Sequence, residues 1–352
     1  MLPAFGLYTH IQANRRRSAL LLVGLFLLVY GLVFALALLA RVWIGLSGEG
    51  VATLEEYLHA AASDCLWWAP AATVATAAWI LAAFRFNPLV IDLVTGAGGI
   101  ARSDDPRLYH ILESLCIARG LTVPKLKIME TGAVNAFASG VNEEQYAITV
   151  TRGLLDTLDE AEIEAVLAHE LTHIRNGDVR MLIIAVVVAG VISFVAELVF
   201  RGLRFGRLSS RSGSRSGNSR KKGGGGALGA VVFALLFLAV AWGLSLVIRF
   251  ALMRSREFLA DAGAVELTKN PDAMIGALRK IAGKGELDGV PSGVMEMCLD
   301  NPRSGFADLF ATHPSIDERI EALVRYAGGR RSASDRDGPV LPGAADPVAP
   351  AA

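Results

Sequence analysis

The sequence predicts an α-rich integral membrane protein that also contains a folded α+β domain exposed to water. Hydrophobic residues make up 53% of the 352 residues and charged residues only 19%, which is too apolar for an ordinary soluble domain. Four long apolar runs are present, each close to the ~20 residues that a helix needs to cross a bilayer. Between the second and third runs, charge rises and the apolar residues become periodic, as expected of an aqueous domain.

Charge and cysteine usage argue against several other classes. Lys plus Arg and Asp plus Glu number 34 each, so the global charge favours neither a nucleic-acid partner nor a generally basic surface. The three cysteines, Cys65, Cys116 and Cys298, lie far apart without a C-x-x-C spacing. This pattern argues against a disulfide framework or a cysteine zinc knuckle, and we interpret the three as structural thiols.

Residues 1–85 are expected to form an N-terminal membrane hairpin, with spans near residues 18–40 and 66–84. The first run follows three arginines at residues 15–17 and lacks a small-residue cleavage site. We therefore interpret it as a retained anchor and not as a signal peptide. The positive-inside trend places the arginines in the cytoplasm and the acidic connection between the two runs outside.

Residues 86–178 are expected to form the first part of a cytoplasmic domain. Residues 106–118 carry apolar side chains at helical spacing. Short strands are predicted after this helix because apolar and β-branched residues alternate between turn signals. The candidate strands are residues 125–129, 134–139 and 146–150. Together they predict a small antiparallel sheet.

A capping-box pattern, Asp159 followed by Glu162, predicts the start of the helix that carries the strongest motif. The motif is H-E-x-x-H, from His169 through Glu170 to His173, and a spacing of four places both imidazoles on one helix face, able to chelate one ion. Zinc bound with one position open lowers the pKa of a bound water to about 7. Glu170 could take that proton and deliver it to a leaving amine. The alternative is a helix with solvated histidine and glutamate side chains.

Catalytic zinc usually has three protein ligands, so a second segment must supply another donor. Glu257 and Asp261 follow the fourth apolar run at a spacing that puts them on one helix face. Glu257 could ligate the metal while Asp261 receives the free N–H of a ligating histidine and fixes its tautomer. On spacing alone, an ordinary solvated or arginine-paired face is the better interpretation.

Residues 179–250 are expected to form a second hydrophobic hairpin, with runs at 179–200 and 227–250 around a loop at 201–226 rich in Gly, Ser and Arg. The two metal-binding helices must meet, so both runs must leave and return on the same side. Full crossing would place the eight basic residues of the loop outside, against the positive-inside trend. A hairpin that does not fully cross is the alternative, and the side of the loop stays open.

Residues 251–327 are expected to supply the second part of the aqueous domain, with helices at 271–281 and 316–326. The irregular segment at 286–310 could form a lid or a wall of the substrate site. Residues 328–352 have little to bury and are expected to be disordered.

The chain resembles the HtpX-type membrane metallopeptidases, within the larger grouping that includes the CAAX prenyl proteases. The matching segments, in order, are residues 6–10, 135–138, 169–178, 256–261, 312–314 and 319–320. The resemblance implies a zincin-like (gluzincin-type) catalytic domain with one Zn²⁺ per chain. It implies His169, His173 and Glu257 as zinc ligands and Glu170 as the catalytic acid and base.

The resemblance also implies roles for quieter residues. Asn135, Ala136 and Phe137 would form an edge strand against which an extended substrate pairs; an ordinary sheet strand is the alternative. His313 would donate to the oxyanion of the tetrahedral intermediate, and Arg319 would hold the local geometry. A capping box at the start of the last helix explains the pattern around His313 equally well.

The activity that the resemblance implies is a zinc-dependent endopeptidase for misfolded or unassembled membrane proteins, active in quality control and stress response. It would lie in a bacterial inner membrane with its catalytic domain in the cytoplasm, acting on protein or peptide substrates and not on nucleic acid. Two alternatives are a catalytically silent zinc-binding scaffold or holdase and a prenylated-peptide protease. The intact Glu170 argues against the first, and only four apolar runs argue against the second.

Overall fold

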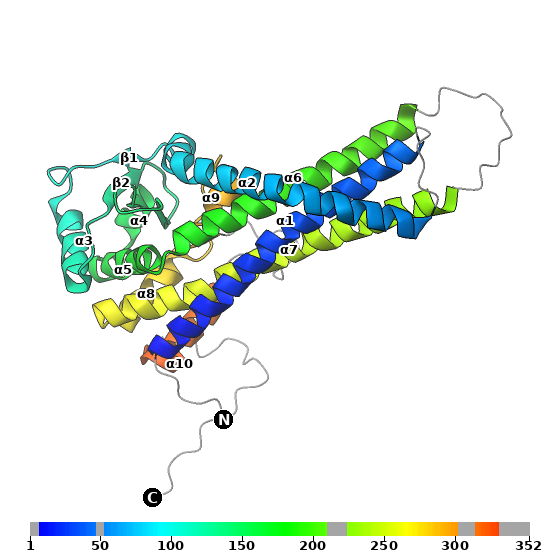
Figure 1. Cartoon of the computed structure of the whole chain (residues 1–352). Helices are drawn as coiled ribbons and strands as arrows, with labels where there is room; N and C mark the ends of the chain where they lie inside the picture. The colour runs from blue at the N-terminus through cyan, green and yellow to red at the C-terminus, as the bar shows by residue number, and fades with distance from the viewer. Residues whose placement is uncertain (1–6, 47–52, 210–223, 302–313, 331–352) are drawn as a thin grey trace, which may run out of the picture.

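A computed structural model describes residues 7–46, 53–209, 224–301 and 314–330. Four long helices form a bundle, and a smaller α+β unit lies at one end of it (Figure 1). The bundle helices are α1 (Leu7–Leu46), α2 (Leu54–Thr95), α6 (Asp178–Ser209) and α7 (Gly224–Thr268). Within the described residues, these four are long and apolar enough to cross a membrane. The expectation of four hydrophobic helices in an α-rich membrane protein is therefore confirmed.

Helix α2 continues past residue 85, where the first hairpin was expected to end. It begins with a capping box formed by Thr53 and Glu56 and ends at Gly96, which adopts the left-handed conformation with φ +64°. Pro88 lies inside the helix without ending it. Gly96 is thus the first effective stop, and the last turns of α2 reach the α+β unit.

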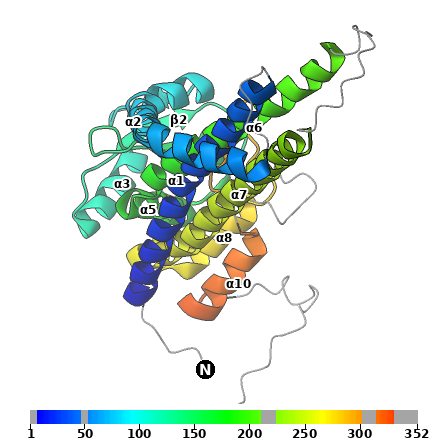
Figure 2. The ribbon, with the colours of Figure 1, turned by 45° about the vertical axis from the view of Figure 1, so that its right-hand side comes forward.

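Helix α1 packs against α7, α2 and α6, and Figure 2 shows it lying along α7. The two helices approach closely at Gly31, where an added Cβ would lie 2.8 Å from Phe237 Cε1. Polar contacts add to the apolar packing between α1 and α2. Tyr30 Oη lies 2.8 Å from Thr73 Oγ1, and an arginine–aspartate pair, Arg41 with Asp64, is bidentate at 2.6 Å for both contacts.

The α+β unit contains a four-stranded sheet of order β1-β2-β4-β3. Its strands are β1 (Gly98–Gly99), β2 (Lys125–Met129), β3 (Ala136–Ser139) and β4 (Ala147–Thr151). The β1–β2 and β3–β4 pairs are antiparallel, but β2 and β4 are parallel. The expectation of an antiparallel sheet is therefore wrong for this pair, because the chain passes from β2 to the far side of β4 before the β3–β4 turn.

Helices complete the α+β unit around the buried helix α5. They are α3 (Pro106–Arg119), α4 (Arg152–Thr157), α5 (Glu160–Asn176), α8 (Pro271–Ile281), α9 (Ser292–Met295) and α10 (Ile316–Ala327). The predicted capping box at the start of α5 is present. Helix α5 packs on α7, α8 and β3, so its polar face is enclosed by protein. Of the basic loop and the tail, residues 210–223 and 331–352 lie outside the described residues.

Candidate metal centre

Helices α5 and α7 lie side by side and carry the two halves of the predicted site. Their approach is so close that a Cβ on Gly263 of α7 would lie 2.5 Å from Thr172 Cγ2 of α5. The absence of a side chain at residue 263 therefore permits this packing. The Thr172 hydroxyl donates to the Ala168 carbonyl at 2.8 Å, and its Oγ1 lies 2.7 Å from the same Cβ position.

His169, His173 and Glu257 converge, and their ligand atoms all lie within 4.8 Å of one another. The two Nε2 atoms are 3.0 Å apart. Glu257 places Oε2 3.6 Å from His169 Nε2 and Oε1 3.5 Å from His173 Nε2. Two imidazoles and one carboxylate are a donor set found in catalytic zinc sites. The residues therefore fit a metal ion with a coordination position left for water.

Carboxylates orient both imidazoles from their far sides. His169 Nδ1 lies 3.0 Å from Asp261 Oδ1, and His173 Nδ1 lies 2.9 Å from Asp178 Oδ2. A proton on each Nδ1 leaves the Nε2 lone pairs facing one another, as metal ligation requires. Asp261 is the residue for which the sequence suggested such a contact. The sequence did not predict a contact between Asp178 and His173. The signal is Gly177, which has a positive φ, ends α5 and turns the chain back toward that helix.

Arg319 of α10 is almost fully buried and joins this network. It donates to Asp261 through Nε at 2.8 Å and through Nη2 at 2.6 Å. Its Nη1 donates to the Leu299 carbonyl at 3.0 Å and lies 3.2 Å from Glu257 Oε2. Although burial alone would lower it, the pKa of Arg319 is raised above its ordinary value by the charges of Asp261 and Glu257. The guanidinium thus stays charged and balances two buried carboxylates.

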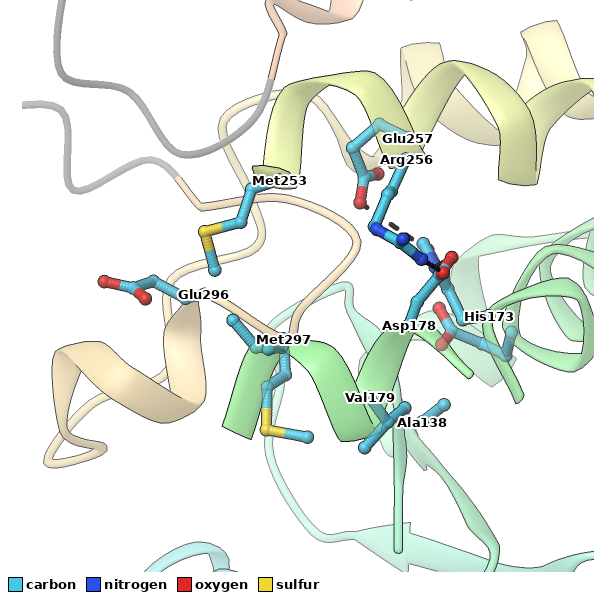
Figure 3. Close-up of a pocket in the computed structure, with 11 residues that line it drawn as sticks. Ala138, His173, Asp178, Val179, Met253, Arg256, Glu257, Glu296 and Met297 are labelled. Atoms are coloured by element: carbon cyan, nitrogen blue, oxygen red, sulfur yellow. Dashed lines mark hydrogen bonds and ion pairs between the residues drawn. The ribbon is translucent and has the colours of Figure 1, made fainter. Parts of the chain in front are cut away.

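A second arginine, Arg256, contacts the carboxylate behind His173. Arg256, next to Glu257 on α7, pairs through Nη1 with Asp178 Oδ1. In Figure 3 the side chains of Arg256, Glu257, Asp178 and His173 point toward one another. The sequence motif contained Arg256 but suggested no role for it. In the structure it connects the carboxylate behind His173 to the helix that supplies Glu257.

Glu170 lies beside the convergent histidines and is only 1% exposed. Burial raises its pKa to about 7, and a backbone hydrogen bond from Ala138 opposes this shift. Within the described residues, its Oε2 has no hydrogen-bond partner. Burial also lowers the pKa of His169 to about 4, which keeps that imidazole neutral at physiological pH. Glu170 and His173 both line the cavity drawn in Figure 3.

Strand β3 is the edge strand of the sheet, next to this cavity. Its beginning is already occupied: Ala136 O accepts from Leu299 N at 2.9 Å, and Phe137 pairs with Cys298. Asn135 just before it is fully buried. The direction of the backbone N–H and C=O groups alternates along a strand, so those of Ala138 point away from β4, as those of Ala136 do. Ala138 also lines the cavity. His313 lies outside the described residues.

Asn135 joins the sheet to the segment around residue 300. Its Nδ2 donates to Gly285 O at 2.7 Å and to Asp300 O at 2.8 Å. Its Oδ1 accepts from Ala136 N at 3.0 Å. A side chain engaged in this way holds the irregular segment against β3.

A family profile described as Peptidase family M48 matches residues 102–327. A protein of Bacteroides fragilis (strain YCH46) named "Protease HtpX homolog" is 38% identical over 256 residues, covering 70% of this chain and 77% of its own length. A protein of Leuconostoc citreum (strain KM20) with the same name is 33% identical over 322 residues, covering 91% and 99%. A solved structure, that of S. mikatae Ste24p, aligns over 74% of this chain and 58% of its own with 18% identity and a TM-score of 0.43.

The family profile and the two relatives named "Protease HtpX homolog" confirm the resemblance to HtpX-type proteases. The family match begins after the first hairpin and covers β2, β3 and β4, both metal-binding helices and the second apolar hairpin. The chain belongs to peptidase family M48 and is a membrane metallopeptidase.

Proposed function

We propose that the protein is a zinc-dependent endopeptidase that cleaves misfolded or unassembled membrane proteins. The observation that carries this proposal is the convergence of His169, His173 and Glu257 next to the buried carboxylate of Glu170. The helices that bear these residues, α5 and α7, lie where the apolar bundle meets the α+β unit. A site at this level would receive chain segments that emerge from the bilayer.

Zinc is the metal that this donor set favours, because it accepts neutral imidazole nitrogen together with a carboxylate. His169, His173 and Glu257 would hold the ion, and Asp261, Asp178 and Arg319 would keep the ligands oriented. A zinc ion held there would lower the pKa of a bound water and polarise the carbonyl of the scissile bond.

Glu170 would act as general base and then as general acid. Burial raises the pKa of Glu170 to about 7. A general acid–base catalyst works best when its pKa lies near the working pH, because it can then both accept and release a proton. A bound cation would lower this value and favour the carboxylate that accepts the proton. The protonated Glu170 would then deliver the proton to the leaving amine.

An extended substrate would pair with β3 near Ala138. The backbone of this residue faces the cavity that contains Glu170. Recognition through backbone groups tolerates many side chains, which suits an enzyme that removes damaged proteins. The beginning of β3, at residues 135–137, would support this segment through its contacts with residues 298–300.

The resemblance to HtpX-type proteases and the charge pattern support a location in the bacterial inner membrane. Arginines at residues 15–17 precede the apolar part of α1, and the positive-inside trend places them in the cytoplasm. The α+β unit lies near this end of α1 (Figure 1), so it would face the cytoplasm too.

The test compares wild-type protein with Glu170→Gln, both loaded with zinc in detergent, on an unfolded casein-like substrate. We expect the wild type to cleave the substrate. The variant should still bind zinc but should not cleave. The substitution preserves all three ligands, so bound zinc reports on the site independently of activity. Zinc binding by both proteins without cleavage of any protein substrate would favour the scaffold or holdase instead.

A further inference from the structure

A second cavity, of about 270 Å³, lies between α2, α6 and α9. Helix α2 contributes a stripe that includes Phe86 and Val90, α6 contributes Ile183 and Val187, and α9 contributes Val294. An apolar cavity of about 150 Å³ already holds a molecule the size of benzene. This one has room for more than one large apolar side chain.

The second cavity adjoins the one that contains Glu170. Leu182 of α6 and Met297, just after α9, line both. A chain that passes Glu170 would therefore bring its neighbouring side chains against the second cavity. The two cavities therefore lie next to each other and share part of their lining.

One wall of this cavity belongs to α2, which is a candidate membrane span. The candidate span in α2 has only 6% of its most apolar window buried inside the protein. Phe86 and Val90 are 54% and 51% exposed although they line the cavity. The cavity is thus open on its α2 side, where an occupant can enter.

One polar side chain interrupts the apolar wall. Among the described lining residues, Asn87 is the only polar one. Its Oδ1 is buried and has no hydrogen-bond partner within the described part of the chain. A buried acceptor left without a donor is costly. A lipid acyl chain has no donor to offer, whereas a peptide offers one N–H at almost every residue.

We propose that this cavity is a substrate subsite for an apolar membrane segment of the protein being cleaved. A rotation of the Asn87 side chain would bring Oδ1 within reach of a backbone N–H that the segment exposes where its helix unwinds. Unpaired backbone groups are expensive in an apolar environment, so a fixed acceptor there favours the unwound form. The inference rests on the proposed function and locates one part of its substrate-binding site.

Photo-crosslinking tests binding without cleavage. The Glu170→Gln protein, in phospholipid nanodiscs, carries a benzophenone amino acid in place of Val90 or, as matched control, of Leu89. Leu89 neighbours Val90 and is similarly exposed, but it does not line the cavity. The probe is a reporter protein with one apolar transmembrane segment. Strong crosslinking at residue 90, weak crosslinking at 89 and competition by unlabelled reporter are expected. Equal crosslinking at both positions, or only lipid adducts at 90, would overturn the proposal.

Kinetics provide the second arm, using the reporter and an unfolded soluble protein with the same cleavage sequence. We expect Asn87→Leu to lower kcat/KM for the reporter about fivefold relative to the soluble protein, the effect of losing one hydrogen bond. Val90→Trp, which fills the cavity, should lower this ratio about tenfold or more. Leu89→Trp should keep the wild-type ratio. Wild-type ratios in the first two variants would overturn the subsite.

The two arms separate this inference from the proposed function. If the wild type cleaves neither substrate, the proposed endopeptidase activity is wrong. Crosslinking in the inactive variant still decides whether the cavity binds a membrane segment. If cleavage depends on Glu170 but crosslinking is equal at residues 89 and 90, the endopeptidase activity stands and the proposed subsite is wrong.

Discussion

His173 Nδ1 lies 2.9 Å from Asp178 Oδ2, across the break between α5 and α6. Gly177 makes this contact possible, because its φ of +70° ends α5 and returns the chain toward the histidine. The other oxygen of Asp178 pairs with Arg256 of α7. One carboxylate therefore connects the start of an apolar helix to both metal-binding helices.

This contact predicts that Asp178→Asn weakens zinc binding by about 10- to 100-fold, as is usual when the carboxylate behind a ligating histidine is lost. Zinc affinity would be measured by competition with a chromogenic chelator. Asp156→Asn is the matched control, since Asp156 is exposed on α4. An unchanged affinity in Asp178→Asn would show that the carboxylate does not orient the ligand.

The buried arginine of the centre leads to a prediction about stability. Arg319→Met leaves Asp261 without its bidentate partner, and breaking a buried pair from one side costs about 3–5 kcal/mol. The free energy of unfolding in detergent should fall by this order, and zinc retention should fall with it. Arg325→Met, at an exposed position of the same helix, should change neither quantity.

The close contact between α5 and α7 predicts that Gly263→Ala is destabilising by about 1–3 kcal/mol, as expected of overpacking. The new Cβ would meet Thr172 Cγ2 at 2.5 Å. Thermal unfolding would show a lower Tm, and adding Thr172→Ala should restore part of the loss. Gly243→Ala provides the control within α7, because nothing lies within 4 Å of the Cβ that it adds. Similar losses in both alanine variants would argue against the helix contact.

Asn135 is predicted to act on stability more than on substrate binding. Asn135→Ala would leave the carbonyls of Gly285 and Asp300 without this donor, at about 1–3 kcal/mol for each group that stays unsatisfied. Unfolding in urea, compared with KM for an unfolded substrate, distinguishes the two roles. A raised KM with wild-type stability would instead support direct contact with substrate.

Cys116 is predicted to be inert in the folded protein. It is fully buried in α3, and burial raises the pKa of its thiol to about 11. An ordinary thiol is largely ionised at pH 9.5, but this one should stay protonated there and resist alkylation. Iodoacetamide labelling of a Cys65→Ser, Cys298→Ser protein, followed by mass spectrometry, measures the rate. Labelling should become rapid in denaturant; rapid labelling of the folded protein would contradict the prediction.

Local patterns in the chain predicted those parts of the fold that depend on neighbouring residues. The capping box of Asp159 and Glu162 is formed as predicted. The four-residue spacing of His169 and His173 places them together on one face of α5. Four apolar helices follow from run length alone. These features depend only on the geometry of a helix and on the transfer of apolar residues out of water. Neither depends on how distant parts of the chain pack.

The sequence by itself thus determined the membrane helices, the two imidazoles with Glu170 between them, and a candidate third ligand on a second helix. Only the tertiary structure decided that Glu257 meets the histidines, that Asp178 lies behind His173, and that β2 runs parallel to β4. It also decided which face of α2 lines a cavity next to Glu170. The physical reason is that these relationships join residues far apart along the chain, and their geometry depends on how whole helices and strands pack.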